Sequence, residues 1–322
     1  MDEVLIGTLI ASTLRVSTPL ILCALAGVLC ERAGVIDLGL EGKMLLTAFA
    51  AAAVGSVSGS LALALLAALA VGVALSMLHG YACVSHRGDQ VVLGMAITMT
   101  AAGLSVVLGI AWFAQGGQTP SLPDGVRLSP WFSSAGDFVA SVPGVGRVLS
   151  IAFFGHTVLV YVSLALVGGV WWLLYRTRFG LRLRAAGENP AMVDAAGVSV
   201  LALRYQALAL NGVLSALAGA YLVLAQNPSF IPNMTAGRGY MALAAMIFGK
   251  WHPVGALWAC LLFGFLDAVS IRLQGATWPW IGAVPVQAIQ ALPYVLTVVL
   301  LAGFIGQALA PKALGKPYIK ER

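Results

Sequence analysis

Charged side chains that could do chemistry are concentrated in one short stretch of an otherwise apolar chain. Residues 31–42 read Glu-Arg-Ala-Gly-Val-Ile-Asp-Leu-Gly-Leu-Glu-Gly, and a lysine follows them. Asp37 and Glu41 are four positions apart, which places both carboxylates on one face if the segment is helical. An ionised group at the centre of a bilayer costs about 3 kcal/mol, so these carboxylates need water, a shallow position or a partner. Lys43 and Arg32 are the candidate partners.

Two interpretations of this stretch are open. It lies at the cytoplasmic end of the second predicted helix and fixes the packing of that helix, or it lines a transport path or touches a partner protein. Gly42-Lys43 resembles part of a phosphate-binding loop, but Asp37 stands where that loop has glycine, and Met44 stands where it has serine or threonine. We therefore expect no nucleotide site in this chain.

Other polar residues interrupt the apolar runs further along the chain. Asn211, Asp267 and Gln290 lie deep in predicted spans and should face the protein interior, whereas Arg204 and Arg272 lie near helix ends and can extend toward the membrane surface. Each of the deep residues either bonds a neighbouring helix or contacts a solute. A ridge of small residues on the sixth predicted span indicates close helix packing: Gly212, Ser215, Ala216 and Gly219.

A long polar insertion, residues 176–200, follows the fifth predicted span. Asn189 can cap a short helix that has Pro190 at its first position, and Gly197 can end that helix. The result is a helix of fewer than ten residues along the membrane surface. It is either an amphipathic connector or a small element that fits a groove of another protein.

Motifs for catalysis or metal binding are absent from the sequence. It contains no HExxH pattern, no cluster of histidine and cysteine ligands, no nucleophile elbow and no dinucleotide fingerprint. The four cysteines lie within or beside apolar segments without CxxC spacing, so we expect small buried hydrophobic residues. We therefore predict neither an enzyme nor a resident metal or cofactor.

The composition determines the class of elements that position these residues. Hydrophobic residues make up 60% of the 322 residues and charged residues only 9%, whereas soluble domains carry roughly 25% charged residues. The apolar runs continue for about 20 residues, enough to cross a bilayer as a helix, and helices satisfy their own backbone hydrogen bonds in hydrocarbon. The fold class is therefore all-α and polytopic. Although the net charge is +6, the basic residues stand at the ends of apolar runs, which argues against nucleic-acid binding.

Hydropathy predicts about nine transmembrane helices, with a range of eight to ten. The seventh is about ten residues long, too short to cross, so it is expected to be a broken or re-entrant half-helix after irregular backbone. The predicted spans are Leu9 to Leu29, Val35 to Val57, Leu61 to Val84, Gln90 to Phe113, Ile151 to Tyr175, Leu201 to Ala225, Gly239 to Phe248, Val254 to Ile271 and Val284 to Ile305.

Arginine and lysine predict the orientation of the spans. Four arginines follow the fifth span and four basic residues follow the last, so both regions should be cytoplasmic. The loop of residues 114–150 and the amino terminus then lie outside. Residues 1–322 are expected to form a single transmembrane domain, with the extracytoplasmic loop at about 114–150 and the cytoplasmic loop at about 176–200.

Three motifs together resemble a known family. They are residues 31–42, the Gly187-Glu-Asn-Pro-Ala loop, and the run from Gly237 that reads Gly-Arg-Gly-Tyr-Met-Ala-Leu-Ala-Ala-Met-Ile-Phe-Gly-Lys-Trp. In this order they are similar to permeases of ATP-binding-cassette (ABC) importers for branched-chain amino acids and sugars, most of all to the nucleoside branch. This chain departs from the family pattern at Asp37, where many relatives carry asparagine.

The resemblance implies a type II importer fold, a location in the bacterial inner membrane and several partners. These are a second related permease, forming a heterodimer, ATPase subunits that bind ATP and Mg²⁺, and an extracytoplasmic substrate-binding protein. It also implies that the cytoplasmic loop is the coupling helix that docks on the ATPase. The residues assigned to coupling are Glu188, Asn189, Pro190, Ala191, Asp194 and Gly197.

The implied activity is translocation of a nucleoside-like solute by alternating access. A neutral, flat nucleoside needs hydrogen-bonding groups and an apolar wall. Residue type and depth suggest these positions for the path: Asp37, Glu41, Asn211, Tyr240, Phe265, Asp267 and Gln290. Sugars, branched-chain amino acids and a flavin are alternative cargoes. An ion-coupled transporter that protonates Asp37, Glu41 and Asp267 is the rival mechanism, and a non-transport scaffold or membrane enzyme is a third class.

Overall fold

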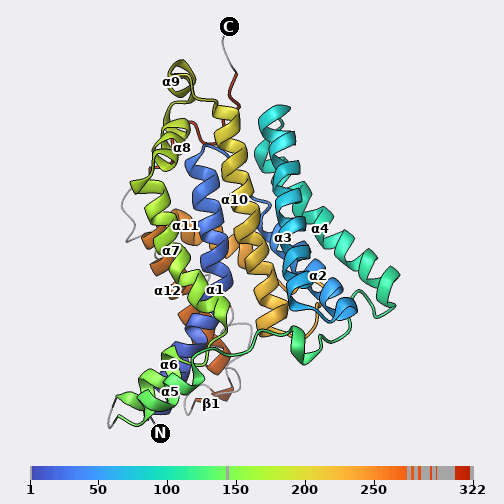
Figure 1. The fold of residues 1–322 in the computed structure, drawn as a ribbon, viewed down its shortest axis with the longest axis vertical. Coiled ribbons are helices and arrows are strands. Elements are labelled where there is room, and N and C mark those ends of the chain that lie inside the picture. Colours follow the sequence, from blue (N-terminus) through green and yellow to red (C-terminus); the bar gives the residue numbers. More distant parts are fainter. Residues whose placement is uncertain are drawn as a thin grey trace.

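The chain folds into an elongated helical bundle (Figure 1). The computed structural model describes residues 2–142, 145–273, 277–278, 282–283, 291, 295 and 309–319. The α-helices are α1 (Asp2–Arg32), α2 (Leu40–Ser58), α3 (Leu61–Gly80), α4 (Gln90–Phe113), α5 (Ser133–Ala140), α6 (Gly146–Phe153), α7 (Val158–Arg176), α8 (Arg178–Glu188), α9 (Pro190–Ala195), α10 (Val200–Tyr221), α11 (Arg238–Phe248) and α12 (Pro253–Leu273). Short π- or 3₁₀-turns are η1 (Tyr81–Ser85), η2 (Asp124–Val126) and η3 (Leu222–Gln226), and β1 (Thr277–Trp278) pairs antiparallel with β2 (Gly282–Ala283).

Seven helices in the described part of the chain are long and apolar enough to cross a membrane. They are Val4–Arg32, Leu40–Ser58, Leu61–Ser85, Gln90–Phe113, Val158–Arg176, Val200–Gln226 and Pro253–Leu273. The predicted span from Val284 to Ile305 lies outside the described residues apart from positions 291 and 295. The helical, polytopic fold class is therefore confirmed, while the number of about nine crossings remains a prediction.

Two predicted boundaries are wrong because glycine interrupts the helix. Gly34 has φ +86°, and α2 begins only at Leu40 instead of Val35, so Asp37 precedes the helix and does not share a helical face with Glu41. Gly155 has φ +74° after α6, which separates that helix from α7. Residues other than glycine rarely adopt these positive φ values. A helix ends where they occur, because the backbone leaves the right-handed helical conformation.

The centre of the bundle consists of α1 and α10, which run side by side along the molecule (Figure 1). Most side chains of α1 and α10 are buried, whereas most side chains of α3 and α4 are at least partly exposed and available to lipid or a partner. The predicted small-residue ridge is confirmed as a close-packing surface. A Cβ atom on Gly212 would lie 2.6 Å from the Gly72 carbonyl oxygen, and one on Gly219 would overlap the Met44 carbonyl.

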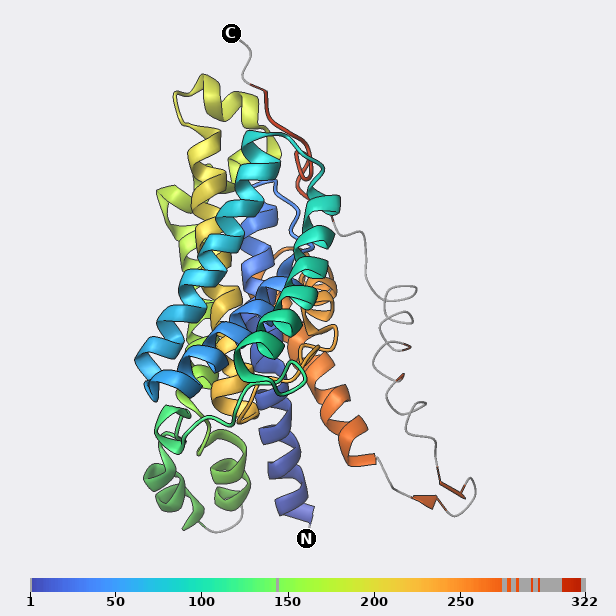
Figure 2. The same cartoon turned by 90° about the vertical axis from the view of Figure 1, so that its right-hand side faces the viewer.

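The two ends of the bundle carry different segments. Figure 2 shows α8, α9 and the last described residues at one end, and the amino terminus with α5 and α6 at the other. The two regions predicted to be cytoplasmic, residues 176–200 and the carboxyl-terminal tail, therefore lie together. The predicted outer loop lies at the opposite end with the amino terminus, as the arginine and lysine pattern requires.

Two non-helical segments reach the middle of the bundle. We call residues 33–39 the first linker and residues 227–237 the second linker; they precede α2 and α11 respectively. From this region α2 runs toward the outer loop, since Gly55 packs on Leu122, and α11 runs toward Arg32 at the end of α1. The short helix α11 lies about midway along the molecule beside α1 (Figure 1). The amino-terminal ends of two oppositely directed helices thus meet inside the protein.

Candidate functional site

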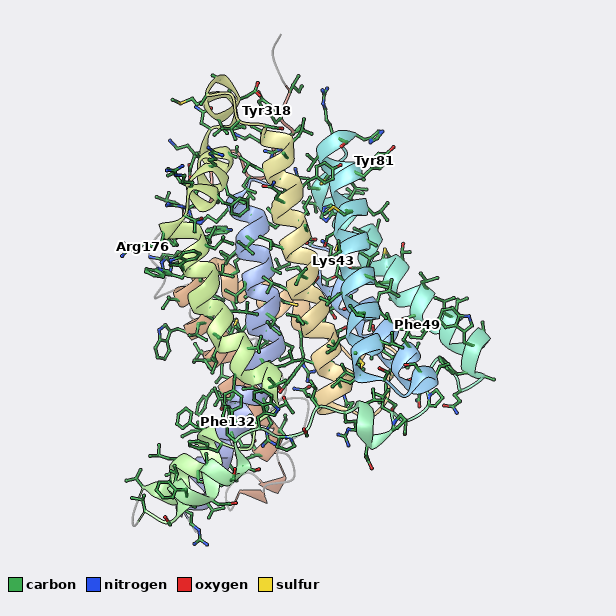
Figure 3. The ribbon with its side chains drawn as sticks, in the orientation of Figure 1. Lys43, Phe49, Tyr81, Phe132, Arg176 and Tyr318 are labelled. Carbon is green, nitrogen blue, oxygen red and sulfur yellow. The ribbon has the colours of Figure 1, made fainter. Side chains whose placement is uncertain are left out.

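A buried ion pair lies where the first linker joins α2. Lys43 Nζ is 2.5 Å from Asp37 Oδ2, and both side chains have no exposed surface. His79 on α3 places its Nδ1 atom 3.1 Å from Asp37 Oδ1, and the backbone N–H of Gly39 donates to the same oxygen at 3.0 Å. Figure 3 shows Lys43 near the middle of the bundle. The predicted partnership of Lys43 with Asp37 is confirmed.

Asn211 extends this ion pair across the bundle. Its Oδ1 atom accepts hydrogen bonds from Lys43 Nζ at 3.0 Å and from Ser76 Oγ at 3.1 Å, while its Nδ2 donates to the Ala26 carbonyl at 3.1 Å. We call Asp37, Lys43, Ser76, His79 and Asn211 the polar core. It joins the first linker to α1, α2, α3 and α10, and all five side chains are buried. Buried charges persist in a low-dielectric interior only when they are paired in this way.

Glu41 caps the amino-terminal end of α11. Its Oε1 accepts the backbone N–H of Gly237 at 2.8 Å, and its Oε2 accepts that of Gly239 at 2.6 Å. These N–H groups have no partner within a helix, and the helix dipole favours a negative charge beside them. A Cβ atom on Gly239 would lie 2.6 Å from the Glu41 Cα atom, so this close approach requires glycine. Glu41 therefore joins α2 to α11.

Arg32, the other predicted partner of the carboxylates, has a different role. Its guanidinium donates to the carbonyls of Trp251 at 2.9 Å and Lys250 at 3.3 Å, and Glu31 Oε2 accepts the Trp251 indole N–H at 2.5 Å. The prediction that Arg32 pairs with Asp37 or Glu41 is wrong, because the first linker carries both carboxylates away from the end of α1. Glu31 and Arg32 hold the turn between α11 and α12.

The remaining predicted path residues lie outside the polar core. Tyr240 on α11 is exposed, with its hydroxyl 3.8 Å from Met95 Sδ on α4, and Phe265 on α12 is exposed as well. Asp267 is half-buried on α12. Gln290 lies outside the described residues. Of the six predicted path positions that the structure describes, three are buried and bonded within this chain, two are exposed, and Asp267 is half-buried.

The predicted short helix in the cytoplasmic loop is confirmed as α9. Asn189 Oδ1 accepts the backbone N–H of Met192 at 3.2 Å, Pro190 occupies the first turn, and Gly197 has φ +78° after the helix. The side chains of Glu188 and Ala191 are exposed, and Asp194 is half-buried. The sequence therefore determines this element locally, through its cap, its proline and its glycine.

A groove of about 560 Å³ lies between α8 and α9. Apolar side chains form much of its wall, among them Leu181, Met192 and Val193, and Arg182 with Glu188 supplies charge at its edge. Arg184 does not extend into solvent, since its guanidinium lies 4.6 Å from the centre of the Tyr175 ring. This end of the molecule offers a shaped, partly apolar surface of the kind that a helix or loop of another protein fits.

Sequence reasoning missed two members of the polar core and misplaced one arginine. Ser76 and His79 are three residues apart on α3, and a histidine within an apolar helix was the available signal. Arg204 was expected to reach the membrane surface, but it is 1% exposed and donates to carbonyls of Ala33 and Lys316. Neither carbonyl is near Arg204 in the sequence, so only the fold reveals the contact.

No group of three or more histidine, cysteine, aspartate or glutamate side chains is arranged to hold a metal ion within the part of the chain that the structure describes. The four cysteines are buried and free, as expected of small apolar residues. The polar core consists of one paired carboxylate, one lysine and neutral or histidine side chains. Its geometry suits the joining of helices inside a membrane.

Comparison with known proteins gives a consistent result. The family described as "Branched-chain amino acid transport system / permease component" matches residues 9–305. The chain is 37% identical to the guanosine ABC transporter permease NupQ of Bacillus subtilis, covering 99% of each chain. It is 36% identical to the nucleoside ABC transporter permease NupC of Lactococcus lactis, covering 98% of this chain and 97% of the relative. A candidate glucose ABC permease of Haloferax volcanii is 36% identical over 83% of this chain and 78% of its own length.

Proposed function

The chain belongs to the family of permease components of branched-chain amino acid transport systems, and from that premise we propose that it carries nucleosides across the inner membrane. As a member of this family it is a multi-pass membrane subunit of an ABC transporter and not an enzyme. The observation that carries the cargo proposal is the similarity to the guanosine and nucleoside permeases, at 37% and 36% identity over nearly the whole of each chain. The relative named for glucose covers less of the chain, which makes a sugar the second candidate.

Three partners complete the proposed importer. ATPase subunits bind ATP and Mg²⁺ and dock on the α8–α9 end, where the exposed Glu188 lines the groove and Ala191 is exposed on α9. A second, related permease pairs with this chain as a heterodimer, and a substrate-binding protein delivers cargo to the outer loop. The single permease domain then alternates between outward-open and inward-open arrangements as the ATPases close and reopen.

The proposed path runs along the face that carries Tyr240 and Phe265, with Asp267 beside it. These side chains provide an aromatic wall and a polar group, the two features that a flat, neutral nucleoside requires. Asp37, Glu41 and Asn211 hold this face in place from within the bundle, because their polar atoms already have partners. We assign Gln290 to the path as well, within the predicted span Val284 to Ile305 that follows α12, and we assign α11 as a broken or re-entrant half-helix.

Uptake by the assembled transporter tests the cargo. In a bacterium that lacks nucleoside uptake, expression of this chain with its partner permease, ATPase and binding protein should restore accumulation of radiolabelled guanosine. Unlabelled nucleosides should compete, and glucose or valine in large excess should not. Competition by glucose alone would replace the nucleoside proposal with a sugar importer, and uptake driven by a proton gradient without ATP hydrolysis would favour the ion-coupled mechanism.

Substitution on the proposed path sharpens this test. Tyr240→Leu with Phe265→Leu should raise the guanosine concentration needed for half-maximal uptake by about tenfold, as expected for loss of about 1.4 kcal/mol of stacking. Trp172→Leu is the matched control, since Trp172 is an exposed aromatic residue on α7, a helix that carries none of the proposed path residues. If both variants change the half-maximal guanosine concentration equally, Tyr240 and Phe265 do not line the path.

Charge reversal tests the proposed ATPase contact. Glu188→Lys with Asp194→Lys should abolish co-purification of the ATPase and lower uptake, whereas Asp137→Lys on the opposite end of the molecule should do neither. The side of the membrane is tested separately, with Ala191→Cys and an impermeant thiol reagent, because the four native cysteines are buried. Labelling of Cys introduced at position 191 only from the outer side would overturn both the orientation and the coupling role.

A further inference from the structure

We propose that residues 311–318, which we call the strap, transmit movement of the α8–α9 end to the first linker and so to the polar core. This inference rests on the ATPase docking proposed above and concerns a segment to which that proposal gives no role. The strap is the part of the carboxyl-terminal tail that lies against the bundle at the α8–α9 end (Figure 2). Its function would be to convert a push on α8 and α9 into displacement of the segment that carries Asp37.

The strap is bonded to α8 and to the first linker at the same time. The backbone N–H of Ala313 donates to the Gly187 carbonyl at 2.9 Å, and that of Gly315 donates to the Gly34 carbonyl at 3.2 Å. Gly315 has φ +75°, and a Cβ atom there would lie 2.8 Å from Ile36 Cδ1. A segment of three residues, 313–315, thus joins the end of α8 to the start of the first linker.

Arg204 holds the strap against the linker from the other side. Its Nη1 and Nη2 atoms both donate to the Lys316 carbonyl at 3.3 Å, and its Nε donates to the Ala33 carbonyl at 3.3 Å. The side chain is 1% exposed, so a full cation is buried where backbone carbonyls are its partners. Burial of an arginine is costly unless its donors are used, and here the donors span the strap and the linker.

Apolar contacts connect the strap to α9. Tyr318 packs against the cluster formed by Val193 of α9, Ala186 of α8 and Val200 with Leu203 of α10. Figure 3 shows Tyr318 at this end of the molecule. A movement of α9 therefore carries the strap with it through side-chain contact, and the strap is fixed to the linker by backbone hydrogen bonds.

The first linker leads directly from the strap to the polar core. Only two residues separate Gly34, bonded to the strap, from Asp37, bonded to Lys43 and close to His79. Between them the Ile36 N–H donates to Gln90 Oε1 at 2.7 Å, which connects the linker to the start of α4. Such a chain of packed and hydrogen-bonded groups is a physical route for coupling between two sites.

Truncation of the strap is the direct test. A chain that ends at Ala310 should still assemble with the ATPase and hydrolyse ATP, but the solute imported per ATP hydrolysed should fall by at least about threefold. The control is a chain that ends at Ile319, which keeps the strap. An unchanged ratio in the chain that ends at Ala310, or loss of ATPase association, would overturn transmission through the strap.

A point substitution tests the same proposal independently of whether the truncated chain folds. Gly315→Ala forces a Cβ against Ile36 at a left-handed backbone position, so it should also lower the import-to-hydrolysis ratio. Gly59→Ala is the matched control, because Gly59 has φ +64° with nothing within 4 Å of the added Cβ. Equal ratios in these two variants would contradict the proposal.

Cross-linking tests whether the strap and α8 move as one body. The Lys312 N–H lies 3.5 Å from Glu188 Oε2, and both residues are exposed, so Glu188→Cys with Lys312→Cys can be joined by a short thiol-specific reagent. Because Glu188 is also assigned to the ATPase contact, the baseline is import by the same double variant before the reagent is added. Cross-linking should leave import at that baseline, and its loss on cross-linking would show that the strap must detach. The two proposals fail separately: import of a different solute by the full-length transporter contradicts the nucleoside cargo, whereas an unchanged ratio contradicts the strap.

Discussion

The two linkers both end at the amino terminus of a helix inside the bundle, yet they are held by different means. The first linker contains Asp37, which is paired with Lys43 inside the protein. The second linker, residues 227–237, has no acidic side chain of its own, and Glu41 of α2 supplies the carboxylate that caps the helix after it. The first linker contains its own charged residue, whereas the second depends on a side chain of α2, the helix that follows the first linker.

The linkers are also attached to opposite ends of the molecule. Carbonyls of the first linker accept hydrogen bonds from Arg204 and from the strap. In the second linker the Pro228 carbonyl accepts the Leu122 N–H at 2.7 Å, and the Phe230 N–H donates to Thr119 Oγ1 at 3.0 Å. The outer loop therefore holds one linker and the α8–α9 end holds the other. Glu41 connects the two regions, because it lies in the helix that follows the first linker and accepts the N–H group of Gly237 at the end of the second.

Removal of Lys43 should have the largest effect on this arrangement. Lys43→Met leaves the Asp37 carboxylate buried without its cation, which should lower the free energy of unfolding by about 3–5 kcal/mol. Thermal unfolding of the detergent-purified protein measures this. Asp37→Asn combined with Lys43→Met should recover most of the loss, because no unpaired charge remains. If the free energy of unfolding of Lys43→Met lies within about 1 kcal/mol of that of the original chain, the Asp37–Lys43 pair does not hold the first linker.

Removal of the shared cap should have an intermediate effect. Glu41→Ala leaves the Gly237 and Gly239 N–H groups without acceptors, which should cost about 2–3 kcal/mol in unfolding free energy and disturb α11 more than α2. Hydrogen exchange of the amides at the start of α11 measures the local part. Glu41→Gln keeps one acceptor oxygen without the charge, so its free energy of unfolding should lie between those of the original chain and Glu41→Ala. If Glu41→Ala accelerates hydrogen exchange more in the first linker than in the second, then Glu41 does not hold the second linker in preference to the first.

Loosening the outer attachment of the second linker should have the smallest effect. Thr119→Val preserves the shape of a buried side chain but leaves the Phe230 N–H without its acceptor, at a cost of about 1 kcal/mol. Proteolysis or hydrogen exchange in residues 227–237 should increase while the first linker stays unchanged. Thr98→Val is the control, since the Thr98 hydroxyl bonds only the Gly94 carbonyl of its own helix. A similar change from both variants would show that the outer loop does not hold the second linker.

Local signals in the sequence predicted the elements whose stability is local. Asn189, Pro190 and Gly197 predicted α9 because a cap, a fixed φ angle and a left-handed terminator act within a few residues. The positions of most spans followed from hydropathy for the same reason. The start of α2 was misplaced because Gly34 continues an apolar run, and hydropathy does not register that its backbone turns.

Partners that are distant in the sequence could be predicted only in part. Lys43 was predicted as a partner of Asp37 because the two residues are close in the chain. The contacts that His79 and Asn211 make with this pair depend on how α3 and α10 pack. Arg32 and Arg204 were misjudged for a related reason. Their partners are backbone carbonyls of Trp251 and Lys316, and every residue has such a carbonyl.

The sequence by itself determined that this chain crosses a membrane as helices, where most of those helices lie, and which short polar helix stands at one end. These properties depend on composition and on neighbours in the chain, because hydrocarbon requires each span to satisfy its own backbone. Only the tertiary structure decided that Glu41 caps α11, that Asn211 joins α10 to three other helices, and that the carboxyl-terminal tail reaches the first linker. Each of these contacts needs two segments far apart in the chain to lie within hydrogen-bonding distance, and a linear pattern does not contain that distance.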